Sequence, residues 1–289
     1  MADENEASGP TIRAPKDHAA PSVFRPENLL REARRQKRLA DVPVPEICVL
    51  DPDGDLVRHL RRTGQATDDP AWPCYHTALA VFTTAGERVG AIPNAVGAPF
   101  AVLVAEQLFA AGCRLLISIT SAGQIVPAGP LPYFVLIDRA LRDEGTSLHY
   151  LPAAPLAAAP THLLAPIAAA LGTMRPPVVR GATWTTDAPF RETEAAISRA
   201  RGVGVLAVEM EAAALYSFAT VHRRDVICFA HVTNQLAQVA GDFEKGEADG
   251  AADALRLLTL TAQAWRRSKN DPPGQSLGID ALRPGAQAR

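Results

Sequence analysis

The chain is short of the residues that mark several common classes of protein. Only four of its 289 residues are cysteine, and Cys48, Cys74, Cys113 and Cys228 are scattered, without the close pairs of a zinc or redox site. At least three of them sit beside apolar residues, which predicts buried free thiols. No uninterrupted apolar run approaches the roughly 18 residues that a membrane-spanning helix needs. The sequence therefore predicts no metal site and no membrane segment.

An excess of positive charge is also missing. The formal net charge is −2 at pH 7, which argues against a general nucleic-acid or anionic-membrane binder. The first residues, Met1 to Glu6, carry acids where a signal peptide would carry positive charge, and no apolar core follows. We therefore expect a cytoplasmic protein whose partner is a small molecule.

Apolar residues are plentiful by comparison. They make up 47% of the chain, enough to bury a full core in one large domain or two small ones. No repeat and no convincing linker divides the sequence. We predict one α/β domain over residues 26–267, between a disordered N-terminal tail (1–25) and a flexible C-terminal tail (268–289).

The order of the predicted elements supports this fold class. A strand, a loop of small residues, a helix and a further strand follow one another in the manner of α/β proteins. Strands are expected at 46–50, 77–82, 88–92, 114–119, 133–137, 178–182, 205–208 and 226–232. Helices are expected from Pro26 through a basic stretch, from Leu56, from Pro99 to about Gly112, and over 250–266.

One short segment combines a buried strand with two carboxylates. Glu209, Met210 and Glu211 directly follow the apolar run 205–208 and precede a run of helix-forming alanine and leucine. Carboxylates at the carboxyl end of a buried strand are costly unless something binds them. One interpretation is that both acids favour the positive end of the following helix. The other is a ligand site.

The segment 205–216 resembles the signature of the nucleoside phosphorylase and nucleosidase superfamily, which includes uridine phosphorylase-like and type I purine nucleoside phosphorylases. Other segments resemble the family in the same order: 97–99 with 105–108, 121–123, 142–150 and 183–193. The resemblance spans about residues 45–265. It implies a single-domain, three-layer α/β fold with a central mixed sheet partly closed into a barrel and flanking helices. It also implies a homo-oligomer, dimer or hexamer, without a metal or organic cofactor.

The same resemblance implies cleavage of an N-ribosidic bond. Met210 would pack against the ribose, Glu211 would take the sugar hydroxyls, and Glu209 would assist. Ser121-Ala122-Gly123 would form the substrate loop. A carboxylate beside a sugar that gains oxocarbenium character also stabilises it electrostatically.

The chain departs from the phosphorolytic members of the family where they bind phosphate. Those members use arginines, because the planar guanidinium group can form two parallel hydrogen bonds with a phosphate. Here Gly54 stands near one such position and Ser118 at another. A third arginine comes from the segment that here reads Tyr75-His76, which the family often offers across a subunit interface. His76 remains a candidate substrate contact.

Hydrolytic members instead use an acid in the first loop to orient or deprotonate water, and their second loop reads Ser-Ala-Gly. This chain has that second loop, and its first loop carries Asp51, Asp53 and Asp55, of which Asp55 aligns best by spacing. Three acids would repel phosphate, although turn formation and helix capping explain one or two of them. Phosphate would require relocated cations such as Arg58, Arg61 or the basic residues of 30–38.

The base-binding side rests on Asn234. Purine-cleaving relatives often carry Asp there to protonate the base, which an Asn side chain cannot do. Asn234 therefore suits a 6-oxopurine or a pyrimidine. Phe190 and Trp184 could stack on the base, and Arg191 lies close to where uridine-type members read the uracil edge. Each also has a plain structural interpretation, as a core aromatic or a surface ion pair.

Three functions remain open on the sequence. Hydrolysis of a nucleoside is slightly favoured, with Glu211, Asp55 and Asn234 as the catalytic residues. The first alternative is a uridine-type phosphorylase that uses phosphate as co-substrate and gives ribose 1-phosphate. The second is a non-catalytic nucleoside-binding protein. His149 and His231 are predicted to be structural residues.

Overall fold

The computed structural model describes residues 15–270 apart from 237 and 239. Its helices are α1 (Pro26–Lys37), α2 (Asp55–Arg62), α3 (Ala98–Ala110), α4 (Thr161–Leu171), α5 (Glu194–Gly202), α6 (Ala212–His222) and α7 (Ala251–Asn270), with short 3-10 helices η1 (Thr146–His149), η2 (Pro189–Arg191) and η3 (Glu247–Gly250). Its strands are β1 (Ile47–Asp51), β2 (Thr67–Asp68), β3 (Ala80–Thr84), β4 (Glu87–Pro93), β5 (Leu115–Gln124), β6 (Tyr133–Asp143), β7 (Leu156–Ala158), β8 (Val178–Thr186), β9 (Val205–Glu209) and β10 (Asp225–Asn234).

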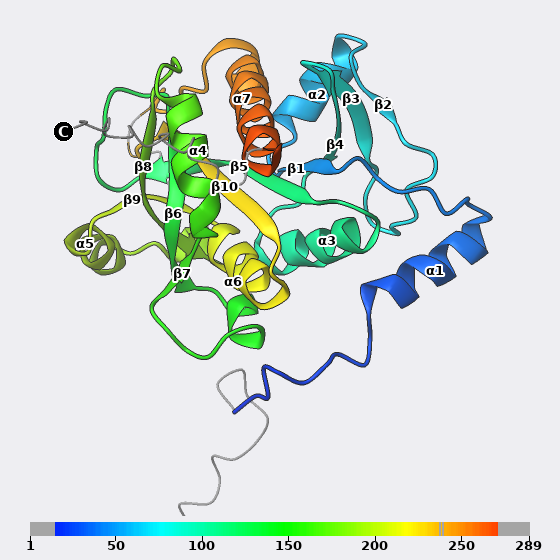
Figure 1. The fold of residues 1–289 in the computed structure, drawn as a ribbon. Coiled ribbons are helices and arrows are strands. Elements are labelled where there is room, and N and C mark those ends of the chain that lie inside the picture. Colours follow the sequence, from blue (N-terminus) through cyan, green and yellow to red (C-terminus); the bar gives the residue numbers. More distant parts are fainter. Residues whose placement is uncertain (1–14, 237, 239, 271–289) are drawn as a thin grey trace, which may run out of the picture.

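The strands form one mixed sheet, and five of them close into a barrel. β5 pairs in parallel with β10, β10 continues through β6, β8 and β9, and β9 returns to β5, so these five strands make a closed barrel. From β5 the sheet also runs outward through β1, β4, β3 and β2, while β7 pairs with β6. This confirms the predicted α/β fold with a mixed sheet partly closed into a barrel (Figure 1).

Apolar strand runs explain the interior. All residues of β1 are buried, as are the first six of β5, which fits parallel strands covered on both faces. The predicted strands are present, but β5 and β6 extend several residues beyond their apolar runs. In the small and polar segment 120–124, β5 continues because its backbone pairs with β10 and β9. A strand prediction based on apolar runs does not detect such pairing.

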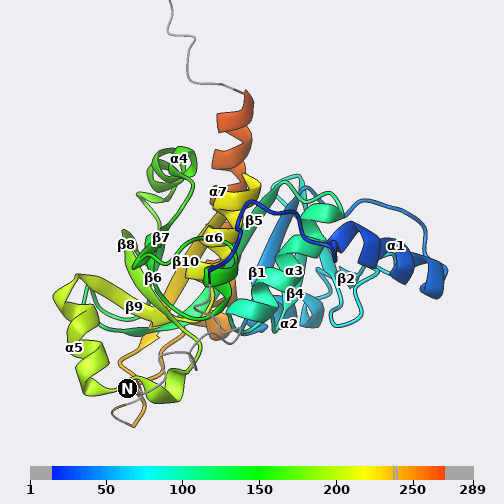
Figure 2. The same ribbon diagram turned by 90° about the horizontal axis from the view of Figure 1, so that it is seen from below.

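Helices cover the sheet on both sides. α6 is tied to the barrel by the Tyr216 hydroxyl, which donates to the carbonyl of Ile137 in β6 (2.6 Å) and accepts from the backbone N–H of Cys228 in β10 (3.0 Å). α3 packs beside α6, and α7 packs against α4 and α2. In both ribbon views α5 and α1 lie at opposite ends of the molecule (Figures 1 and 2).

The first and last described helices lie near the ends of the predicted domain, and α1 begins at Pro26, where that domain starts. α7 continues to Asn270, three residues beyond the expected boundary, and 271–289 lie outside the described residues. Of the predicted N-terminal tail, 1–14 also lie outside them. Residues 15–25 run along the body, where the carbonyl of Leu148 lies 3.3 Å from His18 Nε2. The sequence patterns do not predict α4, α5 or β7.

Candidate functional site

Glu209 is the structural centre of the turn between β9 and α6. Its Oε1 accepts from the hydroxyls of Thr183 (3.1 Å) and Thr185 (2.5 Å). Its Oε2 accepts from the backbone N–H groups of Glu211 (2.7 Å) and Ala212 (2.8 Å). Burial raises the pKa of Glu209, and these four hydrogen bonds oppose that shift because they favour the anion. Glu209 thus fixes the first turn of α6 and has little capacity left for a ligand.

Glu211 lies at the start of α6 in a different state. Its side chain is 1% exposed, and Oε1 accepts from the backbone N–H of Gly97 at 2.7 Å. Its Oε2 is buried and has no hydrogen-bond partner among the described residues. Burial, and then the charge of Glu209, raise the pKa of Glu211 to about 8, while Gly97 and the Thr120 hydroxyl act in the opposite direction. Buried polar atoms are nearly always hydrogen-bonded, so a buried carboxyl oxygen without a partner requires an explanation, and a contact with a ligand is one.

Small residues from two loops surround this carboxyl group. Gly97 ends the turn before α3 with φ of +86°, and Pro99 starts the helix. Met210 is half-buried between the two glutamates. Thr120 stands one residue before the Ser-Ala-Gly loop on β5, so the structure brings that predicted loop to the Glu211 site.

The acids of the first loop are held in three different ways. Asp51 is buried, accepts from the backbone N–H of Val57 in α2 at 2.9 Å, and has its pKa raised by burial to about 6. Asp53 accepts from the backbone N–H of Ser121 at 2.8 Å, which joins the first loop to the Ser-Ala-Gly loop. These bonds bring the predicted nucleophile loop next to the predicted substrate loop.

Asp55, the acid favoured by spacing, is ion-paired. Its Oδ2 lies 2.6 Å from Lys245 Nζ, and its Oδ1 accepts from the guanidinium of Arg58. Lys245 comes from the segment after β10, 190 residues along the chain. Sequence spacing gives no signal for this cation, because the carboxylate-rich composition of its segment is typical of a solvated loop.

At the positions of the missing arginines, Ser118 is uncharged, and the segment Tyr75-His76 has a lysine from α1 beside it, with Lys37 Nζ 4.8 Å from the centroid of the Tyr75 ring. The side chain of Ser118 is buried with its hydroxyl unpartnered among the described residues. The segment before His76 is anchored by Lys37, whose Nζ donates to the carbonyls of Pro73 (2.8 Å) and Cys74 (2.7 Å). His76 itself is exposed. Of the alternative cations, Arg61 pairs with Asp68, away from the acids of the first loop.

The predicted base contacts are divided between the site and the surface. Asn234 is buried opposite Gly123 of the Ser-Ala-Gly loop, with Oδ1 accepting from the backbone N–H of Leu236 at 2.9 Å. Trp184 is buried in a small apolar cluster, and its indole donates to Asp143 at 3.0 Å. Phe190 is fully exposed on η2, and the neighbouring Arg191 is also exposed. The structure thus brings Asn234 to the site and leaves Phe190, Arg191 and His76 on the surface.

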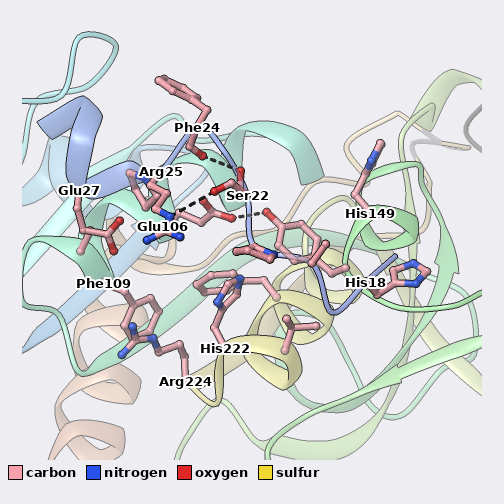
Figure 3. Close-up of a pocket in the computed structure, with 17 residues that line it drawn as sticks. His18, Ser22, Phe24, Arg25, Glu27, Glu106, Phe109, His149, His222 and Arg224 are labelled. Carbon is pink, nitrogen blue, oxygen red and sulfur yellow. Dashed lines mark hydrogen bonds between the residues drawn. The ribbon is translucent and has the colours of Figure 1, made fainter. Parts of the chain in front are cut away.

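A larger cavity lies elsewhere, beneath residues 18–27 (Figure 3). Its volume is about 540 Å³, and its floor contains the rings of Phe109, Phe218 and His222. Glu106, the carboxylate on its wall, accepts from the hydroxyl of Tyr150 at 2.5 Å. None of the residues predicted for catalysis lines this cavity, so its size does not locate the chemistry.

Two further searches of the described residues give negative results. None of the helices between residues 15 and 270 has both the length and the apolar composition of a membrane-spanning helix. Within the same part of the chain, no three His, Cys, Asp or Glu side chains are grouped to hold a metal ion.

Comparison with solved structures places this barrel and its flanking helices in the nucleoside phosphorylase fold. Uridine phosphorylase from Vibrio fischeri ES114 is similar at a TM-score of 0.66 and 20% identity, with 80% of this chain and 96% of that chain covered. Purine nucleoside phosphorylase from Toxoplasma gondii, in complex with immucillin-H, is similar at 0.66 and 14%, with 81% and 96% covered. The same Vibrio fischeri ES114 enzyme complexed with 6-hydroxy-1-naphthoic acid is similar at 0.64 and 18%, with 80% and 93% covered.

The sequence itself identifies the family. The profile of the phosphorylase superfamily matches residues 46–262, and the chain belongs to this superfamily. This confirms the resemblance recognised in the sequence. A search of curated protein sequences finds no match.

Proposed function

We propose that this protein cleaves the N-ribosidic bond of a nucleoside, with water as the nucleophile. The observation that carries the proposal is the carboxyl group of Glu211, which is buried, fixed at one oxygen by Gly97 and, among the described residues, unpartnered at the other. A hydrogen bond between a sugar hydroxyl and Oε2 would remove the cost of burying an unsatisfied oxygen. Met210 would pack against the same sugar, and the Ser121-Ala122-Gly123 loop would border it.

The raised pKa of Glu211 suits this role. A pKa of about 8 keeps the carboxyl group mostly protonated at neutral pH. Positive charge that develops on the sugar would favour the carboxylate, since a nearby opposite charge stabilises the ionised form. Glu211 would therefore interact more strongly with the oxocarbenium-like transition state than with the ground state, which is the requirement for catalysis.

The base would lie toward Asn234. Its position opposite Gly123 supports this assignment. In this proposal Phe190 and Arg191 contact the base only when η2 moves over it. Trp184, which is buried, supports the base site without contacting the base. Glu209 holds the turn and His76 contributes across a subunit interface. A homo-oligomer is supported by the partly exposed apolar side chains of Val96 and Leu103 beside and on α3.

Water is favoured over phosphate by the charge of the first loop. Asp51, Asp53 and Asp55 lie together beside the Ser-Ala-Gly loop, where they would repel an anion. The cations Lys245 and Arg58 are both engaged by Asp55, so in this proposal Asp55 holds the cations and completes the wall of the nucleophile site.

The rival function is phosphorolysis by a uridine-type enzyme. Lys245 and Arg58 favour it, because both stand at the edge of the first loop and could turn toward phosphate if they left Asp55. The fold similarity to uridine phosphorylase is compatible with either nucleophile. A binding protein without catalysis is the third candidate, supported by the locally satisfied Asn234 and the surface position of Phe190.

Product analysis separates the three candidates. Uridine, inosine and adenosine would be incubated with the protein in a phosphate-free buffer, and then with added phosphate. We expect free base and ribose at a rate indifferent to phosphate. Strict dependence on phosphate, with ribose 1-phosphate as product, would establish the rival instead. Binding by calorimetry without turnover would establish a binding protein.

A further inference from the structure

The larger cavity beneath residues 18–27 has the size and the lining of a ligand site. Its volume of about 540 Å³ lies within the range of roughly 300–1,000 Å³ that is typical of small-molecule sites. Aromatic and other apolar side chains form much of its wall, and a few charged groups converge on it. Because ligand sites combine these two properties, the cavity requires an explanation of its own.

The length of a helix separates this cavity from the Glu211 site. Glu211 precedes the first residue of α6, whereas Phe218 and His222, toward the other end of that helix, line the cavity. An α-helix rises 1.5 Å per residue, so the 11 residues of α6 span roughly 16 Å. α3 repeats this arrangement, with Gly97 before its first residue and Phe109 lining the cavity near its end. A ligand in this cavity therefore occupies a second site.

Residues 18–27 cover the cavity as a strap. His18 attaches the strap to the body, since its Nε2 lies 3.3 Å from the carbonyl of Leu148. The Ser22 hydroxyl donates to a backbone carbonyl two residues further on (2.7 Å), and Arg25 Nε donates to the carbonyl of Ser22 (3.3 Å). These two bonds fix a turn in the strap that places Arg25 at the cavity (Figure 3).

Aromatic rings provide a stacking surface on the opposite wall. His222 is exposed, and its ring is backed by Phe218 at a centroid distance of 5.0 Å. Phe109 and Tyr150 pack against Phe218 in turn, at 5.6 and 6.0 Å. Cζ of Arg224 lies 5.3 Å from the centroid of the Phe109 ring, so this guanidinium already occupies the position of a ligand cation. The surface therefore suits a planar ring better than an organic cation.

Glu106 provides a hydrogen-bond acceptor beside these rings. Its Oε1 accepts from the Tyr150 hydroxyl at 2.5 Å, and no residue in the described part of the chain donates to its Oε2. Burial raises the pKa of Tyr150, so the hydroxyl stays a donor at neutral pH. An ionised carboxylate accepts hydrogen bonds but donates none, so a ligand must present an N–H or O–H group to Oε2. Nucleobases combine a planar ring with N–H donors.

Two arginines give one side of the cavity a positive charge. Arg25 and Arg224 form no ion pair with a carboxylate of the described residues, and Figure 3 shows both toward the same side, away from His149. α1 also begins there, and no side chain caps its positive end. Glu27 in its first turn opposes this charge but leaves two cations against one acid. Because a guanidinium group binds phosphate through two parallel hydrogen bonds, this side suits a phosphate group.

We propose that this cavity is a second ligand site and that it binds a nucleoside monophosphate. The base stacks on His222 and donates an N–H to Glu106, while the phosphate lies between Arg25 and Arg224. Since both ends of the ligand are recognised, a nucleoside or inorganic phosphate alone binds more weakly. The inference does not depend on the proposed cleavage reaction, because no residue of the Glu211 site takes part in it.

Calorimetric titration with GMP tests the site, because guanine presents N–H groups along one edge. The wild-type protein and Glu211→Gln are both titrated, so that occupation of the sugar site is detected. We expect GMP to bind the two equally and Arg224→Ala to weaken its binding about 10-fold or more. Arg199→Ala is the control, because it removes an exposed arginine from α5, and it should leave the affinity for GMP unchanged.

Substitutions of His222 report on stacking. His222→Ala removes the ring, and we expect the affinity for GMP to fall about 10-fold, which is typical of one stacked base. His222→Phe keeps a ring and should restore most of the affinity. Thermal melting without ligand monitors the fold of each variant. A role of His222 in packing alone would lower the melting temperature and leave the affinity unchanged, which contradicts the inference.

Guanosine and inorganic phosphate are titrated into the same Glu211→Gln protein, and we expect each to bind about 10-fold or more weakly than GMP. Guanosine that binds as tightly as GMP would overturn the phosphate contact, and phosphate that binds as tightly would overturn the base contact. GMP binding that is lost in Glu211→Gln but retained in Arg224→Ala would place the nucleotide in the sugar site and overturn the inference. So would the absence of GMP binding to the wild-type protein.

Discussion

The backbone N–H of Gly97 and the carboxyl group of Glu211 are joined by a hydrogen bond of 2.7 Å between residues 114 positions apart. The bond connects the turn before α3 with the start of α6. It fixes one oxygen of a buried carboxyl group, and the other has no partner within the described part of the chain. The orientation of Glu211 therefore depends on the backbone conformation of one glycine.

Gly97→Ala tests that dependence. Gly97 has φ of +86° and ψ of 148°, a region that is almost restricted to glycine, yet a Cβ there would meet no atom within 4 Å. We expect backbone strain alone to lower the free energy of unfolding by about 1–3 kcal/mol and to reduce turnover. Urea denaturation measures the first effect and nucleoside cleavage the second.

Gly202→Ala is the matched control for this substitution. Gly202 ends α5 without a positive φ, and a Cβ there also meets no atom within 4 Å. We expect a stability change between zero and a gain of about 1 kcal/mol. Equal effects of the two substitutions would contradict a special role for the Gly97 conformation.

Glu211→Gln tests the sugar contact. The amide keeps the shape of the carboxyl group and removes its ability to become negative, so we expect kcat to fall about 100- to 1000-fold while the fold is retained. Steady-state kinetics and circular dichroism measure the two properties. Glu106→Gln, on the wall of the larger cavity, should leave kcat unchanged. Unchanged turnover in Glu211→Gln would remove Glu211 from the sugar site.

The pKa of Glu211 predicts how stability depends on pH. Between the ordinary value of 4.5 and about 8, the folded protein keeps a proton that the unfolded chain has lost. This contribution is fully present below pH 4.5 and is lost as the pH rises through 8. Asp51 and Glu192, with pKa values raised to about 6 and about 7, act in the same direction at lower pH.

The window from pH 7 to 8 separates Glu211 best from these two acids. As the pH rises from 7 to 8, Glu211 loses its proton in the folded protein. We expect this loss to lower the free energy of unfolding by about 1 kcal/mol and kcat/KM to rise as the carboxylate forms. Glu211→Gln should flatten the stability profile in the same window. Urea denaturation at intervals of half a pH unit measures the free energy of unfolding as a function of pH. An identical slope in Glu211→Gln and in the wild-type protein would assign the proton to another group.

Asn234→Asp tests the base side. An acid at this position can protonate a departing purine, which the amide cannot. We expect kcat/KM for adenosine to rise relative to inosine by roughly 10- to 100-fold. Thr233→Ser, one residue earlier on β10, is the control and should leave the ratio unchanged. If Asn234→Asp also keeps the wild-type ratio, Asn234 does not contact the reacting part of the base.

Several features of this fold are predictable because they are local in the sequence. The apolar runs of β1 and β9 locate buried strands, and the Glu-Met-Glu segment locates the turn into α6. α4 escapes prediction because Pro166 interrupts an alanine-rich segment without strong periodicity. β7 is only three residues long, too short to give an alternating pattern.

Long-range contacts explain what the sequence does not predict about the site. Spacing favours Asp55, but its partner Lys245 is 190 residues away. The family resemblance assigns the sugar to Glu211, but only the folded chain shows why the two glutamates differ: Thr183 and Thr185 satisfy Glu209 Oε1, whereas Glu211 Oε2 has no partner among the described residues. His231 has an ordinary strand context, and only the folded chain reveals its buried Nε2.

The three-way pairing of β5 also bears on how the native protein opens. This strand pairs with β1, β9 and β10 and carries Thr120 and Ser121. Its amide hydrogens should exchange with deuterium as slowly as the protein unfolds globally, since local fluctuations cannot free a strand whose neighbours lock it on each side. We therefore expect ligands to enter by displacement of loops around a frame that stays closed, and amide protection in β5 to be the same with and without substrate.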